Sequence, residues 1–304
     1  MSPPRRSVGP HWGTRGLLVV SLGLVVLSAV LDLAPITGVA ALVMFAGLLF
    51  TIVHGQVALG GRNLIAFMLI TVLISFAAET IGVATGVVFG DYHYTDELGP
   101  KLLGVPLVIP IAYTAMAYAS LTIARAVLGV ESGGGRPLAV ALAGAIAMVG
   151  WDVAMDPGLS TVHGDWIWEQ AGGPYFGVGI HNYIGWFCTV FAFMTVYGLW
   201  ERRNPIAAPT GVAASRLFAS EPVLFYVVIA LGIVATPVIG ATPESLAVPQ
   251  NYSGSISDLN ASMALVACFT MGGPAAFALL RIWNRHRAES RPRRQPTAPR
   301  PGTS

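Results

Sequence analysis

Residues 64–89 read LIAFMLITVLISFAAETIGVATGVVF, a run in which Glu79 is the only charged side chain. Roughly 20 apolar residues are enough for a helix to cross the ~30 Å hydrocarbon core of a bilayer. The run therefore predicts a membrane-spanning helix. An ionisable side chain at membrane depth is costly, and it usually faces a protein interior or a cavity, where it marks function. Glu79 is therefore a candidate functional residue.

Apolar runs of this kind recur along the whole chain. Hydrophobic residues make up 54% of the sequence and charged residues 11%, against roughly 25% charged residues in soluble domains. We predict an all-α fold, a polytopic transmembrane helix bundle with about eight spans, at residues 17–31, 36–53, 64–89, 102–124, 137–155, 181–200, 221–240 and 261–283. The spans form a single membrane-embedded domain, residues 17–283, between a basic N-terminal segment, 1–16, and a disordered basic tail, 284–304.

The basic residues support an even number of spans. If the N-terminus lies inside, the inner segments are 1–16, 54–63, 125–136, 201–220 and 284–304. Of the 17 Lys and Arg residues, all except Lys101 fall in these segments or at the adjoining span edges. Cytoplasmic loops carry an excess of Lys and Arg. We therefore predict cytoplasmic termini and a multi-pass protein of the cell membrane, and the net charge of +2 does not indicate a nucleic-acid surface.

Two local features have alternative interpretations. Arg5 and Arg6 precede the first apolar run, as in a secretory signal peptide. No clear small-x-small cleavage site precedes Asp32, and removal would leave an odd number of spans, so we expect this segment to be retained. Cys188 and Cys268 lie inside predicted spans, so we expect small apolar core residues and no disulfide.

Three carboxyl groups are predicted to meet inside the bundle. Asp152 and Asp156 are four residues apart, which stacks them on one face of a helix. Gly82 and Gly86 form a G-x-x-x-G pair on the same face as Glu79, and such pairs let helices approach closely. We expect this face to meet the helix that carries Asp152, with Glu79 within about 10 Å of one of the two aspartates. In such a water-poor space at least one of the three acids should keep its proton near neutral pH.

Further features lie near the predicted outer face. Pro106 and Pro110 are expected to kink the fourth span. Acids and aromatic residues gather in segments 90–101 and 156–181. Trp and Tyr are common as interfacial anchors in any membrane protein, but several of these flank the acids directly. Asp165 is expected at the solvated rim.

Other site classes find less support. Asp91, His93, His163, Asp165 and His181 could supply oxygen and nitrogen ligands to a metal, but di-iron membrane hydroxylases use many more paired histidines, so we expect no metal. Asp152-x-x-x-Asp156 resembles half of an Asp-rich diphosphate motif, yet no second motif follows and the acidic face offers only Lys101. No Gly-x-Ser-x-Gly elbow for a nucleophilic serine is present. A proton-coupled transporter stays open, because membrane carboxylates also relay protons.

Four motifs in order resemble the carotenoid biosynthesis membrane proteins typified by bisanhydrobacterioruberin hydratase. They are ETIGVATGVVFGDYHY at 79–94, LGVP at 103–106, WDVAMDP at 151–157, and WIW at 166–168 continued by GPYFGV at 173–178 with NYIGW at 182–186, except that the expected proline after Val178 is Gly179. Tyr113 likewise stands where Trp is common. The resemblance covers residues 60–200 in detail.

The resemblance implies an enzyme, a hydro-lyase that adds water to the terminal double bond of a linear carotenoid end group and forms a tertiary alcohol. Its partners would be the membrane-dissolved carotenoid, the bilayer and other enzymes of the pathway, and it would need no cofactor. A carboxylic acid kept neutral by burial can protonate an alkene, and aromatic faces can stabilise the resulting cation. The alternative function is a proton-coupled transporter or a non-catalytic carotenoid-binding membrane protein.

The predicted catalytic residues are Glu79, Asp152 and Asp156, with Asp152 favoured as the proton donor and another of the three as the base for water. Asn182 is expected to orient the water. The predicted substrate-binding residues are Trp151, Tyr92, Tyr94, Trp166, Trp168, Tyr175, Phe176, Asn182 and Trp186.

Overall fold

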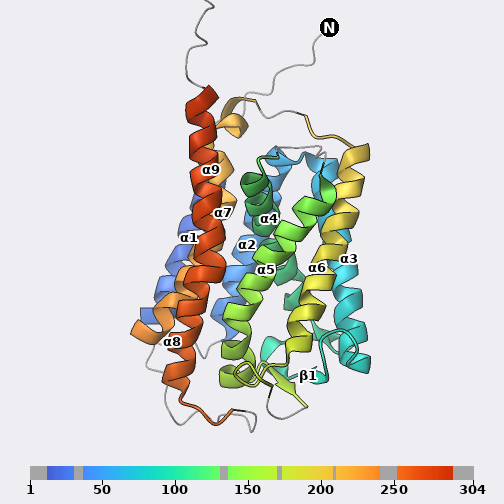
Figure 1. The fold of residues 1–304 in the computed structure, drawn as a ribbon, viewed down its shortest axis with the longest axis vertical. Helices are drawn as coiled ribbons and strands as arrows, with labels where there is room; N and C mark the ends of the chain where they lie inside the picture. Colours follow the sequence, from blue (N-terminus) through green and yellow to red (C-terminus); the bar gives the residue numbers. More distant parts are fainter. Residues whose placement is uncertain are drawn as a thin grey trace, which may run out of the picture.

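The computed structural model describes residues 12–30, 37–130, 136–169, 173–207, 210–239 and 252–289. These residues form a bundle of long helices with short strands gathered at one end (Figure 1). The helices are α1 (Trp12–Val30), α2 (Thr37–Ala58), α3 (Gly61–Thr85), α4 (Val108–Leu128), α5 (Pro137–Asp156), α6 (Ile180–Arg203), α7 (Arg216–Ile239), α8 (Ile256–Ala267) and α9 (Gly273–Glu289). The strands are β1 (Tyr92–Tyr94), β2 (Lys101–Leu102), β3 (Val105–Pro106) and β4 (Trp166–Trp168).

The predicted all-α transmembrane bundle is confirmed. Seven described segments are long and apolar enough to cross a membrane, and α1 adds a shorter apolar helix, Trp12–Val26. One of the seven consists of α8 and α9 joined through a π-helical turn, Cys268–Gly272. The predicted terminal segments are largely outside the described residues, at 1–11 and 290–304. Within the predicted disordered tail, however, α9 continues as far as Glu289.

Helix α3 has polar residues on its inner face and an apolar outer face. Ile65, Leu69 and Leu73, each four residues from the next, are exposed, whereas Ser75 and Glu79 are buried. Lipid tails are as apolar as leucine, so burial in the bundle is not reserved for large apolar residues, and small or polar residues share the helix contacts with Leu64 and Phe67. This distribution turns Glu79 into the protein, with 2% of its surface exposed.

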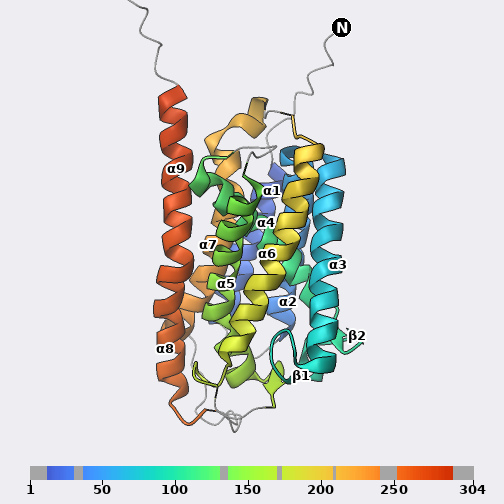
Figure 2. The same ribbon diagram turned by 45° about the vertical axis from the view of Figure 1, so that its right-hand side comes forward.

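Helix α4 lies at the centre of the bundle. It packs against α2, α3, α5, α7 and α9, and residues 113–121 are all buried. Alanine is frequent in this stretch, and small side chains let neighbouring helices approach closely. Helix α5 also packs on α6, and α6 on α3, so α3, α4, α5 and α6 lie next to one another in the bundle (Figure 2).

The connection between the third and fourth predicted spans is longer in the structure than in the prediction. The third span ends at Thr85, and the fourth begins at Val108, after a β2–β3 hairpin. The predicted proline kink in the fourth span is wrong. Pro106 belongs to β3, and Pro110 lies in the first turn of α4, where a missing N–H leaves no helical bond unmade.

Two packing predictions are also wrong. Cys188 and Cys268 are exposed on the helix surface and do not lie in the core. Gly82 does not meet the helix that carries Asp152, because the space beside its Cα is filled by the ring of Phe89, which follows on the same chain segment. Gly86 ends α3 in the left-handed conformation, with φ +68°, which glycine adopts without strain.

Helix α5 continues beyond its proline as a π-helical turn, Pro157–His163. Proline has no N–H, so the carbonyl of Val153 one turn earlier lacks its helical donor. The Tyr175 hydroxyl donates to this carbonyl at 3.1 Å. A side chain from the loop before α6 therefore completes the hydrogen bonding of α5.

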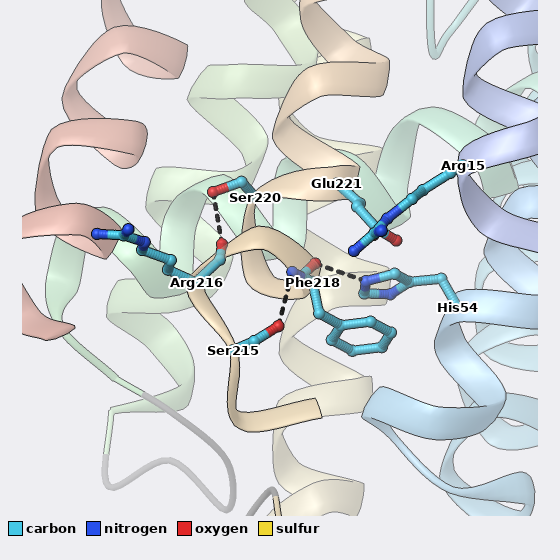
Figure 3. A network of polar contacts seen from close by, with 7 residues as sticks. All are labelled: Arg15, His54, Ser215, Arg216, Phe218, Ser220 and Glu221. Carbon is cyan, nitrogen blue, oxygen red and sulfur yellow. Dashed lines mark hydrogen bonds and ion pairs between the residues drawn. The ribbon is translucent and has the colours of Figure 1, made fainter. Parts of the chain in front are cut away.

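Helix α7 also contains a proline that leaves a carbonyl without its helical donor, and here a histidine from another helix supplies the donor (Figure 3). Pro222 lies inside the helix and leaves the carbonyl of Phe218 without its helical donor. His54 of α2 lies with Nε2 at 2.9 Å from that oxygen. A carbonyl only accepts, so Nε2 carries the proton, and Nδ1 of the neutral ring can accept from the Tyr118 hydroxyl at 2.6 Å.

Described arginines lie near helix ends at one end of the bundle, and the strands lie at the other (Figures 1 and 2). Two of the arginines are paired with buried acids, Arg125 with Glu201 and Arg15 with Glu221. Lys101 belongs to the strand end, where it binds Asp96 and the carbonyl of Tyr94. By the positive-inside rule the arginine end is predicted to face the cytoplasm.

Candidate functional site

A two-stranded ladder closes the strand end of the site. β1 and β4 pair antiparallel, with Tyr92 opposite Trp168 and Tyr94 opposite Trp166. Successive side chains of a strand point to opposite faces, so these four rings share the buried face, while His93 points outward. The ring centroids of the pairs are 5.2 Å and 6.0 Å apart. The alternations YHY and WIW thus place an aromatic surface over the ends of the helices.

Three tyrosine hydroxyls converge on Glu79. Tyr92 and Tyr94 donate to Oε2 at 2.7 Å and 2.9 Å, and Tyr113 of α4 donates to Oε1 at 2.9 Å. Burial raises the pKa of Tyr92 and Tyr94, and the charge of Glu79 raises it further, so both hydroxyls keep their protons. An ionised carboxylate is an acceptor only. Both carboxylate oxygens of Glu79 therefore accept hydrogen bonds from tyrosine hydroxyls.

Asp156 and Asp152 share one amide. Asn182 of α6 donates from Nδ2 to Asp156 Oδ2 at 2.6 Å and lies 3.3 Å from Asp152 Oδ2. Trp166 of β4 donates from Nε1 to Asp156 Oδ1 at 3.1 Å. Both aspartates are buried, and their common contact with Asn182 agrees with the shared helix face predicted from their four-residue spacing. Asn182 therefore holds the two carboxyl groups in fixed relation to each other.

Glu79 and Asp156 both line a cavity of about 490 Å³. Its aromatic walls include a parallel stack of Tyr113 on Trp186, with centroids 4.3 Å apart, and Trp151 against the edge of Trp186. Further walls come from α2, α7 and α8 and are mainly apolar. The described residues that form them are Ala41, Met44, Ile229, Ile233, Thr236, Asn260 and Met263. The cavity thus joins a carboxyl-bearing, aromatic end to an apolar end.

The rim of the cavity is less solvated than the sequence predicts. Asp165 lines the cavity with 2% of its surface exposed, so its prediction as a solvated residue is wrong. Its position is fixed through the backbone, because its N–H bonds the Leu159 carbonyl and its carbonyl accepts from Thr95. Burial, and then the charge of nearby Glu97, raises the pKa of the Asp165 carboxyl to about 7.

Most of the predicted site residues lie around this cavity, although their roles stay predictions. The structure places the following there: Glu79, Asp156, Tyr92, Tyr94, Trp151, Trp166, Trp168, Asn182 and Trp186. Asp152 contacts Asn182 and is not among the residues that line the cavity. Tyr175 and Phe176 do not line it either. Tyr175 bonds the Val153 carbonyl, and Phe176 packs against Tyr175 and Tyr252.

Residues that the sequence did not assign to the site also lie at the cavity. Tyr113 donates to Glu79, although in the sequence it stood out only as a departure from Trp. Asp165, His163 and Glu97 line the outer part. These three residues share one signal in the sequence. Ionisable side chains are rare in this chain, and the three lie within or beside the aromatic segments. Among the residues that the structure describes, no three His, Cys, Asp or Glu side chains are grouped as metal ligands.

Comparison with known proteins shows what kind of protein carries this site. The family described as carotenoid biosynthesis protein matches residues 37–244, more than half of the chain. This chain belongs to that family. It is 30% identical over 115 residues to bisanhydrobacterioruberin hydratase of Haloarcula japonica, and the alignment covers 38% of each chain. The chain thus matches well under half the length of this curated relative, and no solved structure matches it.

Membership of the carotenoid biosynthesis family confirms the resemblance predicted from the motifs. The protein is a membrane protein of carotenoid biosynthesis, with a helix bundle that contains a cavity with aromatic walls. The family match includes every residue that lines the cavity except Asn260 and Met263 of α8.

Proposed function

We propose that this family member is a hydro-lyase that adds water to the terminal double bond of a linear carotenoid end group. The observation that carries the proposal is the placement of Glu79 and Asp156 in one mainly apolar cavity with aromatic walls. An isoprenoid end group has no polar atoms to recognise, so its site needs apolar contact area and few polar groups. The apolar end of the cavity, formed by α2, α7 and α8, suits the polyene chain.

Asp156 is the better placed proton donor of the two aspartates. The sequence favoured Asp152, but Asp156 lines the cavity and Asp152 does not. In the proposed reaction, the Asp156 carboxyl gives its proton to the less substituted carbon of the alkene, and the π electrons form that C–H bond. The other carbon becomes a tertiary cation. Trp151, Trp186 and Tyr113 present rings in the cavity wall that can stabilise this charge.

Glu79 is then the base for the attacking water. The three tyrosine donors hold its carboxylate oxygens in fixed directions. Water adds its oxygen to the cation and releases one proton to Glu79, so that the product is a tertiary alcohol. The proton must return to Asp156 before the next cycle. Tyr92 bonds Glu79 and lines the same cavity as Asp156, so its hydroxyl is a candidate for this proton return.

Pigment analysis by mass tests the proposal. The protein is co-expressed with a pathway that makes a linear carotenoid, and the pigments are compared with those of cells that lack the protein. A gain of one water per modified end is the expected result. An unchanged pigment would reject hydration, and a proton-flux assay in liposomes would then separate a transporter from a carotenoid-binding protein.

A further inference from the structure

One part of the cavity that holds Glu79 and Asp156 has no role in the proposed reaction. It lies next to the β1–β4 ladder, between the 3₁₀ turn Asp96–Leu98 and the π-helical turn Pro157–His163. We name it the outer limb, and the residues that define it are Glu97, Leu98, Gly158, Leu159, His163 and Asp165. Three of these six residues are ionisable, although the cavity as a whole has mainly aromatic and apolar walls. The outer limb is therefore suited to a polar occupant.

The outer limb reaches the surface of the protein. Glu97 lines the cavity and is also exposed, whereas Asp165 lines the same cavity and is buried. The limb thus leads from a carboxyl group in contact with solvent to one inside the protein.

The backbone of Asp165 is fixed, and its side chain is left for another partner. Its carbonyl accepts from the N–H and the hydroxyl of Thr95, and its N–H donates to the Leu159 carbonyl. Within the described part of the chain, no group hydrogen-bonds its carboxyl oxygens. A buried polar group without a hydrogen bond is costly, and buried water commonly supplies the missing bond. The carboxyl therefore points to a small ligand that can donate a hydrogen bond.

The outer limb adjoins both catalytic acids. Asp165 precedes Trp166 in the chain and bonds the residue after Tyr94, so the limb lies beside the ladder pair that these two rings form. Tyr94 donates to Glu79 at 2.9 Å, and Trp166 donates to Asp156 at 3.1 Å. A ligand that passes Asp165 thus arrives next to the hydrogen bonds that hold the acids.

Hydration has two substrates of opposite polarity, and the cavity offers a different part to each. The polyene fits the apolar end formed by α2, α7 and α8. The hydrocarbon core of a bilayer holds no water, so the second substrate must enter the bundle from an aqueous face. A buried water typically makes about three hydrogen bonds to polar groups, and the ionisable side chains of the outer limb supply such groups where the cavity meets solvent.

We propose that the outer limb is the entry path for the water that the reaction consumes, and that the Asp165 carboxyl binds this water on its way to the acids. The inference rests on the proposed hydration. Asp165 accepts a hydrogen bond from the water and does not take up its proton. The oxygen of this water becomes the oxygen of the tertiary alcohol, and its proton goes to Glu79.

Hydroxyl-radical footprinting of the full-length protein in membranes tests the path without reference to activity. Brief X-ray irradiation turns water into radicals that oxidise the side chains beside it, and mass spectrometry locates the oxidised residues. Met155 lines the cavity next to Asp156, whereas Met148, two turns earlier on α5, is fully buried and is not part of the lining. We expect Met155 to be oxidised and Met148 to be protected.

Gly158→Phe closes the outer limb without changing a carboxyl group. Gly158 lines the cavity, and a Cβ placed on it meets no other atom within 4 Å. We expect this variant to lose most of the oxidation of Met155 and most of the hydration activity, while carotenoid still co-purifies with it. The matched control is Gly179→Phe, which adds the same ring in open space outside the cavity and should keep both. Wild-type oxidation and hydration in Gly158→Phe would overturn the entry path.

A second pair of variants tests Asp165 and replaces Gly158→Phe if that protein does not fold. Asp165→Leu keeps the branched shape and removes both oxygens, so hydration should be about 10-fold slower at unchanged carotenoid binding. Asp165→Asn can still bind water and should keep most of the activity. A wild-type rate in Asp165→Leu would overturn the role of Asp165, and equal losses in the two variants would replace water binding by an effect of charge. If the wild-type protein hydrates no carotenoid, the proposed function fails, whereas protection of Met155 in the wild-type protein is the result that rejects the entry path itself.

Discussion

Asp156→Asn is the sharpest test of the proposed chemistry, because it keeps the shape of the side chain and removes the transferable proton. The structure also gives its cost in stability. Asp156 accepts from Trp166 at one oxygen and from Asn182 at the other. Asparagine has one oxygen, so either orientation of its amide leaves one of these buried N–H donors facing an NH₂ group. An unsatisfied buried donor costs roughly 1–3 kcal/mol, which the folded protein should survive.

The expected loss of activity is larger than the loss of stability. A positioned general acid contributes about 10²–10⁴-fold to a rate, so Asp156→Asn should lower the rate of carotenoid hydration at least ~100-fold. Asp152→Asn is the matched comparison. Asp152 lies outside the cavity wall and its contact to Asn182 is long, at 3.3 Å. Loss of one weak hydrogen bond, at about 1 kcal/mol or less, should lower the rate by less than ~10-fold.

The assay is the initial rate of hydrated pigment formation in membranes, normalised to the amount of folded protein and accompanied by thermal unfolding in detergent. If Asp152→Asn were inactive and Asp156→Asn active, the argument from the cavity wall would be refuted. Asp152 would then be the proton donor, as the sequence favoured. Wild-type rates in both variants would reject the acid mechanism, and the aspartates would then be structural residues at a helix end.

Three further predictions follow from single contacts. Tyr113→Phe removes one donor from Glu79 but keeps the stack on Trp186, so we expect roughly 10- to 100-fold slower hydration at unchanged helix content by circular dichroism, from the loss of a hydrogen bond to a charged group; full activity would contradict it. The pKa of Asp165 is raised to about 7 in the folded protein, so the folded state binds this proton more tightly than the unfolded chain does. The free energy of unfolding should therefore fall as pH rises from about 4 to 7. Asp165→Asn should flatten the pH dependence of the melting temperature in that window and raise it at pH 8, whereas exposed Asp96→Asn should not. Gly185→Ala puts a Cβ against the carbonyl oxygen of Val88 in the turn after α3, so it should destabilise by about 1–3 kcal/mol or displace that turn. Gly179→Ala, with open space around it, is the control, and equal unfolding midpoints would count against this packing.

The helices follow from the sequence because a long apolar run has one stable structure in a bilayer. The acids were found for a related reason: charge is rare in this chain, so each buried carboxyl stands out. Glu79 and Asp156 could therefore be assigned to one interior without knowledge of helix packing. The hydrogen-bond partners of these acids could not be predicted. They include Tyr113 and Asn182, which look like ordinary polar residues in their own helices.

The strand end was the least predictable part. The segments YHY and WIW are each three residues long, and they are separated by more than 70 residues of chain, so neither shows a partner in its sequence. Their aromatic residues match interfacial anchors equally well. Only the paired ladder shows that the rings face inward and that Asp165 is covered. The contact of Tyr175 could not be predicted for a similar reason, since the carbonyl that it bonds becomes available through a proline in another element.

The two proline-freed carbonyls fix the register of the bundle. Apolar helices in lipid can slide along each other with little change in contact area, because one leucine face resembles the next. The Phe218 carbonyl accepts from His54 at one position only, and a shift of α2 along α7 by one turn, about 5.4 Å, would leave it without a donor where water is scarce. The Val153 carbonyl sets the loop before α6 against α5 in the same manner. Each proline thus sets the axial position of the neighbouring segment, because only one position brings a donor to the freed carbonyl.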